Sequence, residues 1–372
     1  MKKIHLFVLS LNEATGGGSH HNAVSFVRFL KEKNYCVIVH TVTTGNNLPP
    51  TDIKIIEHGS GLSLSEMTKT VLRLLKEYED DADIFFLYGV DFSWAGGKFR
   101  KQGGQVPVVV YLDNYLHSMN AGQWQGYPYY LKRLLWDKTI GLYNAKYVDN
   151  FLAVSPFLQE TFVRFGFPKK RFSVVPNFFE IQKNKKKTIK NTDTVDLLYT
   201  GRITYDKGTD MLLEILARIP ECYKWRLRIV GEGPAKESCQ TLVRTLHLES
   251  RVSFSPWQPA ILLTQEYANA DIFVHPARWP EPFGRTIVES LEYGVPVIVP
   301  TLGGASWIAK GAGLEFKNND SESLYQATLT LIKDKELREK LGAAGKERID
   351  MFSKNIVGQE ILKVFDRLAN NG

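Results

Sequence analysis

Short apolar runs alternate with amphipathic stretches through most of the chain, which is the pattern of a parallel sheet with crossover helices. In the first half these runs are rich in Val, Ile and Phe and alternate little, as expected of strands buried on both faces. Helical periodicity lies between them, for example at Ser19–Lys33 and Ser63–Glu79. The pattern predicts strands at residues 3–11, 36–42, 53–57, 84–88, 106–112, 151–155 and 173–176.

A polar, lysine-rich stretch from Glu180 to Thr194 interrupts this alternation, and we interpret it as a solvated linker between domains. The alternation then restarts, and the stretch from Ser321 to Asn370 is helical by its periodicity. Further strands are predicted at residues 195–200, 226–230, 252–255, 272–275 and 295–299.

These elements predict an α/β protein of two doubly wound domains that face each other across a cleft. The first, acceptor-binding domain would comprise residues 1–182, and the second, donor-binding domain residues 195–352. Residues 183–194 would link them, and residues 353–372 would form a helix that packs back on the first domain. The tetrapeptide Ala-Asp-Ile-Phe occurs at 82–85 and 270–273, so we expect both domains to open a strand in the same way.

Composition favours a globular protein without a membrane span. Of the 372 residues, 44% are hydrophobic and 23% charged, and no apolar run approaches the ~18 residues that a spanning helix needs. The apolar start reads as a buried strand, because Asn12 and Glu13 follow it in place of a signal-peptide cleavage site. The cysteines, Cys36, Cys222 and Cys239, are odd in number and widely spaced, which predicts reduced thiols in the cytoplasm.

The net charge of +7 suits an anionic partner: a nucleic acid, a membrane surface or a phosphorylated small molecule. No basic helix with groove-reading spacing and no RNA-binding aromatic signature is present, so we expect no nucleic-acid partner.

The segment Thr200–Gly208 places two cations beside a helix N-terminus. A predicted strand ends at Gly201 and Arg202, and a helix begins near Lys207. Free N–H groups and the helix dipole favour anions there, and Arg and Lys both bind phosphate oxygens. Taken alone, the segment is equally consistent with a surface turn that carries two solvated cations.

A second segment combines two carboxylates with another helix N-terminus. Glu281 lies on a proline-rich loop, Gly284 and Arg285 open a helix where a phosphate could bind, and Glu289 lies in its second turn. A carboxylate can accept hydrogen bonds from two vicinal hydroxyls, as on a sugar or a ribose. The alternative is that Glu281 complements the helix dipole and Glu289 is merely exposed.

The segment Glu281-Pro-Phe-Gly-Arg-Thr-Ile-Val-Glu289 resembles the Glu-x7-Glu motif of the retaining glycosyltransferases of family 4, which have the GT-B fold. The remaining segments similar to the family span nearly the whole chain: Gly16-Gly-Gly18, Gly201-Arg202 with Lys207-Gly208, Val230-Gly-Glu-Gly-Pro234, and Tyr293-Gly-Val-Pro-Val297.

The resemblance implies a site for a nucleotide diphosphate sugar. Arg202 and Lys207 would bind the diphosphate, Glu289 the ribose and Glu281 the transferred sugar. The backbone of Phe283, Gly284 and Arg285 would lie near the sugar and phosphates, and the base would lie beside Trp257. Glycines would let the protein backbone approach the donor closely: Gly16, Gly17, Gly18 and Gly231. The donor is a substrate, so no cofactor and no metal are expected.

Two positions depart from the family pattern. Asp113 stands where a His is common at the end of the fifth strand, and His117 follows four residues later. Either side chain could assist catalysis, or Asp113 could simply cap the next turn. Trp307 stands where the family usually has Glu, three residues after Gly304, which would reshape the sugar pocket.

Three other features are weighed against simpler interpretations. Asp81 and Asp83 have the spacing of a metal-binding Asp-x-Asp, but they precede a strand, so we interpret them as solvated. His275 is interpreted as a core histidine. A stretch containing Tyr129, Lys132, Arg133 and Trp136 is aromatic and basic, which is equally typical of a helix on an anionic membrane and of a core-facing helix with solvated cations.

The sequence thus predicts a metal-independent, retaining transferase that moves a hexose or N-acetylhexosamine from a nucleotide diphosphate, with UDP favoured. The acceptor would be a hydroxyl of a lipid-linked, lipopolysaccharide or polysaccharide glycan. The protein would be cytoplasmic and peripheral on the inner membrane face if the basic aromatic helix binds lipid. The alternatives are a sugar-nucleotide epimerase or hydrolase on the same scaffold, and a non-catalytic subunit that binds nucleotide or glycan.

Overall fold

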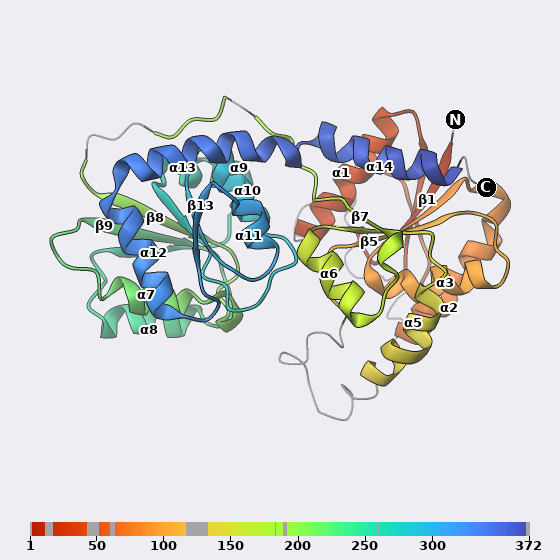
Figure 1. Cartoon of the computed structure of the whole chain (residues 1–372), viewed down its shortest axis with the longest axis horizontal. Helices are drawn as coiled ribbons and strands as arrows, with labels where there is room; N and C mark the ends of the chain where they lie inside the picture. The colour runs from red at the N-terminus through yellow and green to blue at the C-terminus, as the bar shows by residue number, and fades with distance from the viewer. Residues whose placement is uncertain are drawn as a thin grey trace. The chain divides into compact units, whose positions relative to one another are not determined.

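The computed structural model describes residues 2–11, 18–42, 52–59, 64–116, 133–182, 184–188, 192–258 and 260–369. The chain forms two compact units, which are treated separately below. Unit 1 comprises residues 1–179 together with 354–372, and unit 2 comprises residues 180–353. Each unit is built on one sheet of parallel strands with helices packed against it (Figure 1).

The sheet of unit 1 has the strand order β3-β2-β1-β4-β5-β6-β7. The order reverses at β1, so the carboxyl ends of β1 and β4 flank the crevice where doubly wound sheets bind ligands. Its strands are β1 (Lys3–Val8), β2 (Cys36–Thr41), β3 (Ile55–Glu57), β4 (Ile84–Tyr88), β5 (Val108–Leu112), β6 (Asn150–Ala153) and β7 (Phe172–Val174).

Longer helices of unit 1 connect these strands, and short 3₁₀ and π turns lie at residues 79–81, 90–92, 169–171 and 137–141. Helix α6 shows the local rules: Ser155 caps its first turn by accepting from the Leu158 N–H, and Gly166 ends it in the left-handed conformation. The helices are α1 (Gly18–Glu32), α2 (Leu64–Glu77), α3 (Ser93–Lys101), α5 (Leu142–Ala145), α6 (Pro156–Phe165) and α14 (Lys354–Ala369).

Helix α14 closes the core of unit 1 although it follows unit 2 in sequence. The ring of Phe365 is fully buried, and its centroid lies 5.7 Å from that of Phe86 on β4. Gly358 faces the ring of Phe29 on α1 so closely that a Cβ there would come within 2.2 Å of it.

A chain of three histidine rings crosses one side of the unit 1 sheet. His5 Nδ1 lies 2.9 Å from His40 Nε2, His40 Nδ1 lies 2.8 Å from His58 Nε2, and Asp81 Oδ2 lies 3.2 Å from His5 Nε2. His5 and His40 are fully buried. Burial lowers the pKa of all three rings, and the neighbouring rings lower the pKa of His40 further, to about 3. The rings are therefore neutral at pH 7.

The sheet of unit 2 has the order β10-β9-β8-β11-β12-β13, again parallel throughout. Its strands are β8 (Val195–Thr200), β9 (Trp225–Val230), β10 (Val252–Ser255), β11 (Ile272–Val274), β12 (Val297–Pro300) and β13 (Gly313–Phe316). Its helices are α7 (Thr209–Leu216), α8 (Lys236–Thr245), α9 (Ala260–Asn269), α10 (Arg285–Glu292), α11 (Gly304–Ala309), α12 (Ser321–Lys333) and α13 (Lys335–Arg348), with a 3₁₀ turn at 349–352.

Both copies of Ala-Asp-Ile-Phe open a strand by the same hydrogen bonds, as their repetition predicts. The Asp83 carboxylate accepts from the N–H of Lys3 on β1, and the Asp271 carboxylate accepts from the N–H of Asp196 on β8, at 3.0 Å. In each unit the side chain therefore ties the fourth strand to the first one.

The predicted α/β fold class of two parallel sheets with flanking helices is confirmed. One correction concerns the lysines expected to be solvated between the domains. Lys185 pairs with Glu292 on α10 at 2.7 Å, and Lys187 pairs with Asp271 at 2.9 Å, so this segment is packed on unit 2.

Candidate active site

The loop after β8 carries the two predicted phosphate-binding cations. Arg202 is exposed, and its carbonyl accepts a hydrogen bond of 2.6 Å from the buried Tyr199 hydroxyl. Gly208 has a φ of 69°, and a Cβ on it would lie 2.0 Å from the Pro276 carbonyl oxygen. Only glycine therefore lets this loop press against the loop that follows β11. That contact brings Lys207 next to Glu281.

Lys207 and Glu281 form an ion pair, with only 16% and 12% of their side chains exposed. Burial alone would raise the pKa of Glu281, but the charge of Lys207 and hydrogen bonds from Lys207 and Trp279 outweigh it, as does His275 once it is protonated at acid pH. The pKa of Glu281 falls to about 2, so this carboxylate is ionised at any pH near neutrality. Lys207, the residue predicted to bind the diphosphate, is thus in direct contact with Glu281, the residue predicted to bind the sugar.

His275 lies at the end of β11 beside this ion pair. It is buried, as the sequence predicts, yet its Nε2 is 3.5 Å from Glu281 Oε2. Burial lowers the pKa of His275, and Lys207 lowers it further against the opposing effect of Glu281. A neutral imidazole therefore lies against the carboxylate. The sequence did not indicate this contact, because a histidine at the end of a buried strand fits a core position equally well.

Glu289 is held by residues that the sequence did not single out. It lies on α10, and its Oε2 accepts a hydrogen bond of 2.9 Å from the hydroxyl of Tyr267 on α9. The Tyr267 hydroxyl is also 3.0 Å from Thr200 Oγ1 at the end of β8. Arg285 lies 4.0 Å from the other carboxylate oxygen. Tyr267 is only 2% exposed, so it fixes this carboxylate with little freedom.

The other predicted donor-site residues surround the same edge of the unit 2 sheet. Gly231 follows β9, and a Cβ on it would lie 1.9 Å from the Gly201 carbonyl oxygen, so the loops after β8 and β9 touch there. Gly284 precedes α10 as its N-cap. Trp257 follows β10 and is 56% exposed, which leaves its indole ring accessible to a flat ligand.

Trp307, which replaces the expected Glu, packs with two other aromatic rings. Its centroid lies 6.4 Å from that of Phe283 and 5.4 Å from that of Phe352. Phe283 is 5% exposed, so its side chain belongs to the core while its backbone leads into α10. The substitution thus places a packing residue where the family has a carboxylate.

In unit 1, Asp113 lies at the carboxyl end of β5. Its carboxylate accepts a hydrogen bond from the Ser19 hydroxyl in the first turn of α1, which begins at Gly18. Burial raises the pKa of Asp113, the Ser19 bond opposes this, and the nearby charges of Asp91 and His20 act in opposite directions. The side chain is therefore joined to α1. The predicted residues Gly16, Gly17, His117, Tyr129 and Lys132 lie outside the described residues.

Arg133 does not occupy the lipid-facing position that one interpretation of its sequence gives it. It is 8% exposed and pairs with Asp137 at 2.9 Å and Asp91 at 3.5 Å. Its guanidinium also lies 5.2 Å from the ring centroid of Trp136, which is half-buried. Exposed apolar side chains nearby come from other positions, Leu135, Ile140 and Tyr143.

Asp81 and Asp83 are occupied by contacts within the protein: Asp81 pairs with Lys3 and His5, and Asp83 accepts from the Lys3 backbone. In the parts of the chain that the structure describes, His, Cys, Asp and Glu side chains form no group of three able to hold a metal ion. Over the same ranges, no helix combines the length and apolar character needed to cross a membrane.

Two family models match consecutive halves of the chain. The model for glycosyltransferase family 4 matches residues 16–183, and the model for glycosyl transferases group 1 matches residues 180–348.

Among curated proteins, the chain is 28% identical over 204 residues to the lipopolysaccharide core biosynthesis glycosyltransferase LpsE of Rhizobium meliloti, covering 53% of this chain and 58% of LpsE. It is 23% identical over 368 residues to the capsular polysaccharide biosynthesis glycosyltransferase CapM of Staphylococcus aureus, covering 91% and 92% of the two chains. For LpsE and several other curated relatives, the match covers less than two thirds of the relative's own length.

Among solved structures, the Anabaena protein Alr3699/HepE in complex with UDP matches with a TM-score of 0.77 at 18% identity, over 99% of this chain and all (100%) of that one. At this identity the likeness shows the fold. Together with the two family models, it shows that the chain belongs to the family 4 and group 1 glycosyltransferases of GT-B fold.

Proposed function

We propose that this protein transfers a hexose or N-acetylhexosamine from a nucleotide diphosphate sugar, with UDP as the favoured carrier, to a glycan hydroxyl. The observation that carries the proposal is the largely buried Lys207–Glu281 pair at the carboxyl edge of the unit 2 sheet, where Arg202 also follows β8 and where Tyr267 and Thr200 tie Glu289 to the end of β8. Cations for a diphosphate and carboxylates for hydroxyls lie together there. The UDP in the HepE complex supports the choice of nucleotide.

The acceptor is a lipid-linked, lipopolysaccharide or polysaccharide glycan. The roles of LpsE and CapM in lipopolysaccharide core and capsular polysaccharide biosynthesis support this class. An acceptor of this kind would bring the protein to the inner face of the membrane. The exposed Leu135, Ile140 and Tyr143, with Lys138 close by in sequence, are the described residues suited to that surface.

The mechanism follows from electrostatics. As the bond to the sugar breaks, negative charge builds on the departing diphosphate, and preorganised donors stabilise it. Arg202, Lys207 and the N–H groups at the start of α10 would serve as these donors, so a metal ion would not be required. Glu281 would orient the sugar, and the configuration at the transferred carbon would be retained, as the family resemblance implies.

A transfer assay with a panel of nucleotide sugars and extracted glycolipid acceptors tests the proposal. Product is expected with a UDP-sugar, in the presence of EDTA, and with the original anomeric configuration by NMR. Release of free sugar without an acceptor would favour a hydrolase, and UDP binding without turnover on any acceptor would favour a non-catalytic subunit. Loss of activity in EDTA that manganese restores would overturn the metal-free mechanism.

A further inference from the structure

A cavity of about 350 Å³ lies in unit 2 at the sheet edge opposite the candidate active site. Asp271, which lines it, immediately precedes β11, whereas Arg202 and His275 follow the carboxyl ends of β8 and β11. The cavity is therefore separate from the donor site proposed above, and none of its lining residues has a part in that site.

Helix α13 supplies one wall of the cavity. The residues of this helix that line the cavity recur at spacings of three and four, which places them on one face of the helix. They are Lys335, Arg338, Glu339, Gly342 and Lys346. A Cβ on Gly342 would lie 2.1 Å from the Gly294 carbonyl oxygen. The helix therefore sits directly on the turn after α10, and this contact forms the floor of the cavity together with the ring of Tyr293.

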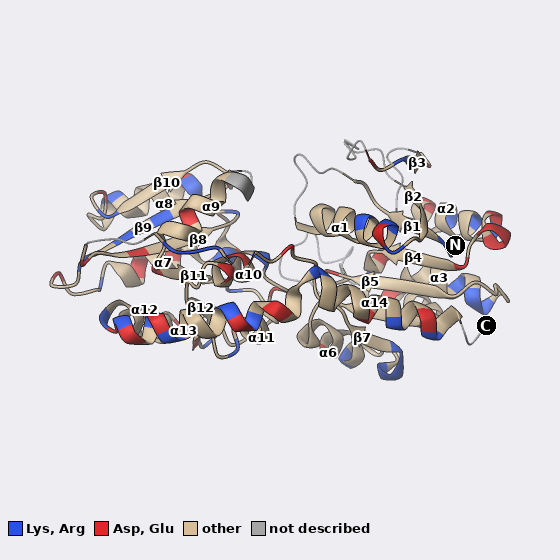
Figure 2. Ribbon diagram, turned by 90° about the horizontal axis from the view of Figure 1, so that it is seen from above, with Lys and Arg blue, Asp and Glu red and all other residues tan. Residues whose placement is uncertain are grey.

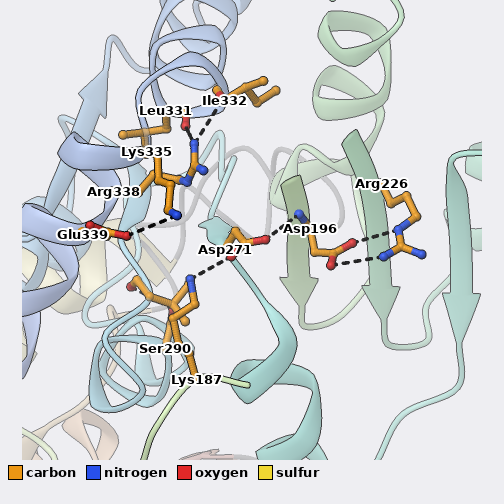
Figure 3. A network of polar contacts seen from close by, with 11 residues as sticks. Lys187, Asp196, Arg226, Asp271, Ser290, Leu331, Ile332, Lys335, Arg338 and Glu339 are labelled. Carbon is orange, nitrogen blue, oxygen red and sulfur yellow. Dashed lines mark hydrogen bonds and ion pairs between the residues drawn. The ribbon is translucent and has the colours of Figure 1, made fainter. Parts of the chain in front are cut away.

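The opposite wall is the lysine-rich segment that precedes β8. Lys187 Nζ pairs with Asp271 Oδ1 at 2.9 Å, and Lys346 Nζ donates to the Lys185 carbonyl at 2.6 Å. These bonds hold Lys186 and Lys187 at the rim, facing α13. Figure 3 shows Lys187 and Asp271 joined on one side, with Lys335, Arg338 and Glu339 on the other.

Positive charge exceeds negative charge around the cavity. Its lining contains the five cations Lys186, Lys187, Lys335, Arg338 and Lys346 but only the two carboxylates Asp271 and Glu339, which leaves three positive charges. Figure 2 shows charges of both signs along α13, so the excess arises where the lysine-rich segment meets this helix. Like charges gathered in a concave site repel one another, and an anion would relieve that repulsion.

Arg338 is the anchored member of this set. Its NH1 donates to the carbonyls of Leu331 and Ile332, at 2.6 and 3.0 Å, which fixes the guanidinium at the end of α12. Burial lowers its pKa, while Asp271, Asp334 and Glu339 oppose the shift. A partly desolvated guanidinium held in place loses little freedom when an anion binds to its remaining N–H groups.

We propose that this cavity is a second anion site, which binds a small phosphate-bearing molecule such as pyrophosphate or a sugar phosphate. Its volume matches the lower end of the range of about 300–1,000 Å³ for small-molecule sites, and is too small for a polymer. The phosphate oxygens would accept from Arg338, Lys335 and Lys186. Lys187 would be shared between the anion and Asp271, so binding would tie the lysine-rich segment to α13.

Calorimetric titration with inorganic pyrophosphate tests the site in three proteins. The Lys186→Gln/Lys335→Gln double variant is expected to bind about 5- to 30-fold more weakly than wild type, since two partly exposed charge contacts are lost. Lys340→Gln, which changes an exposed lysine of α13 outside the cavity, is the matched control and should bind as wild type does. Saturating UDP occupies the proposed donor site in every titration, so that pyrophosphate reports on the second site, and Lys207→Ala, which alters only the donor site, should keep this binding.

A second arm identifies the source of the phosphate. Flotation with phosphatidylglycerol vesicles, compared with phosphatidylcholine vesicles, detects recognition of a lipid headgroup. Vesicle binding that the double variant loses and the control keeps would assign the site to a lipid phosphate, whereas pyrophosphate binding alone would assign it to a free metabolite. If neither probe distinguishes the double variant from Lys340→Gln, the proposal is wrong.

Discussion

Lys207 and Glu281 neutralise each other in the proposed donor site, yet both could contact a nucleotide sugar at once. An ammonium group has three N–H donors, so Lys207 can keep Glu281 as a partner and still donate to a phosphate oxygen. The low pKa of Glu281 means that this carboxylate stays ionised well below neutral pH.

Replacing either cation by alanine should weaken UDP binding. Arg202→Ala or Lys207→Ala each removes a charge-assisted contact worth about 1.5–3 kcal/mol, so the Kd for UDP should rise about 10- to 100-fold. Isothermal titration calorimetry measures the Kd, and Tm serves as the control for folding. Unchanged affinity in both variants would remove these residues from the site.

The two glutamates should separate binding from turnover. Glu289→Gln is expected to raise the Kd for UDP about 10- to 100-fold, because the ribose loses a charged acceptor. Glu281→Gln should bind UDP as well as wild type or more tightly, because Lys207 is released from its carboxylate, while kcat falls about 10²-fold from misplacement of the sugar.

Tyr267→Phe provides a matched control, since it removes only the hydroxyl that holds Glu289. It should weaken UDP binding less than Glu289→Gln does. Equal loss of UDP binding in Glu281→Gln and Glu289→Gln would contradict this division of roles.

For Asp113, an experiment can distinguish a role in catalysis from a role in capping the neighbouring turn. Asp113→Asn keeps the size and the hydrogen bond with Ser19 but removes the charge, so transfer should fall about 10²-fold if the carboxylate acts as a base. Because its pKa is raised, wild-type activity should decline on the acid side as this group is protonated, and the variant should lack that decline. Wild-type turnover in Asp113→Asn, with severe loss in His117→Ala, would move the role to His117.

The sequence singles out candidate donor-site residues that lie within one motif, but not all of the residues that contact them from elsewhere in the fold. The spacing of Glu281 and Glu289 on a loop and its following helix is local, so it can be read without a structure. His275 lies in the same loop as Glu281 but was interpreted as a core residue, whereas Tyr267 contributes only because the folded chain pairs it with Thr200 on β8 and Glu289 on α10. No local pattern specifies that pairing.

At the scale of elements, most strands were predictable from the sequence, even the edge strand β10, but β13 was not. Strands β4, β8 and β10 have the predicted bounds, since their apolar runs are bounded by polar or turn residues. Strand β13, Gly313–Phe316, was missed because its short sequence mixes glycine, apolar residues and the charged Glu315. Its pairing with β12, rather than its composition, makes it a strand.

The contribution of α14 to the stability of unit 1 can be measured by replacing one buried aromatic side chain. Phe365→Ala removes a fully buried side chain that contacts Phe86, and should lower the free energy of unfolding by about 3–5 kcal/mol. Ile356→Ala changes a side chain on the same helix that is 46% exposed, and should cost less than about 0.5 kcal/mol. Urea unfolding monitored by circular dichroism distinguishes the two, and equal effects would mean that α14 does not close this core.

For the whole molecule, the histidine chain predicts acid sensitivity. The pKa of His40 is about 3 in the folded protein, against about 6.5 when unfolded, so the unfolded state binds more protons between these values. Stability is therefore complete above about pH 6.5 and falls with pH, by about 2 kcal/mol from this ring at pH 5. Urea unfolding of His40→Gln at pH 7 and pH 5 should show a smaller pH dependence than wild type, and an equal one would contradict the role of the ring.

The division of unit 1 into two sequence segments has a consequence for synthesis on the ribosome. Its sheet is complete by Phe179, but α14, which covers Phe29 and Phe86, is translated only after all of unit 2. At about 5–20 residues per second, roughly ten to thirty-five seconds pass in between. Unit 2 is contiguous in sequence and can fold first. Until α14 is synthesised, the side chains of Phe29 and Phe86 in unit 1 lack the helix that covers them. We therefore expect the nascent chain to need a chaperone at these side chains, and a circular permutant that places α14 before β1 to need it less.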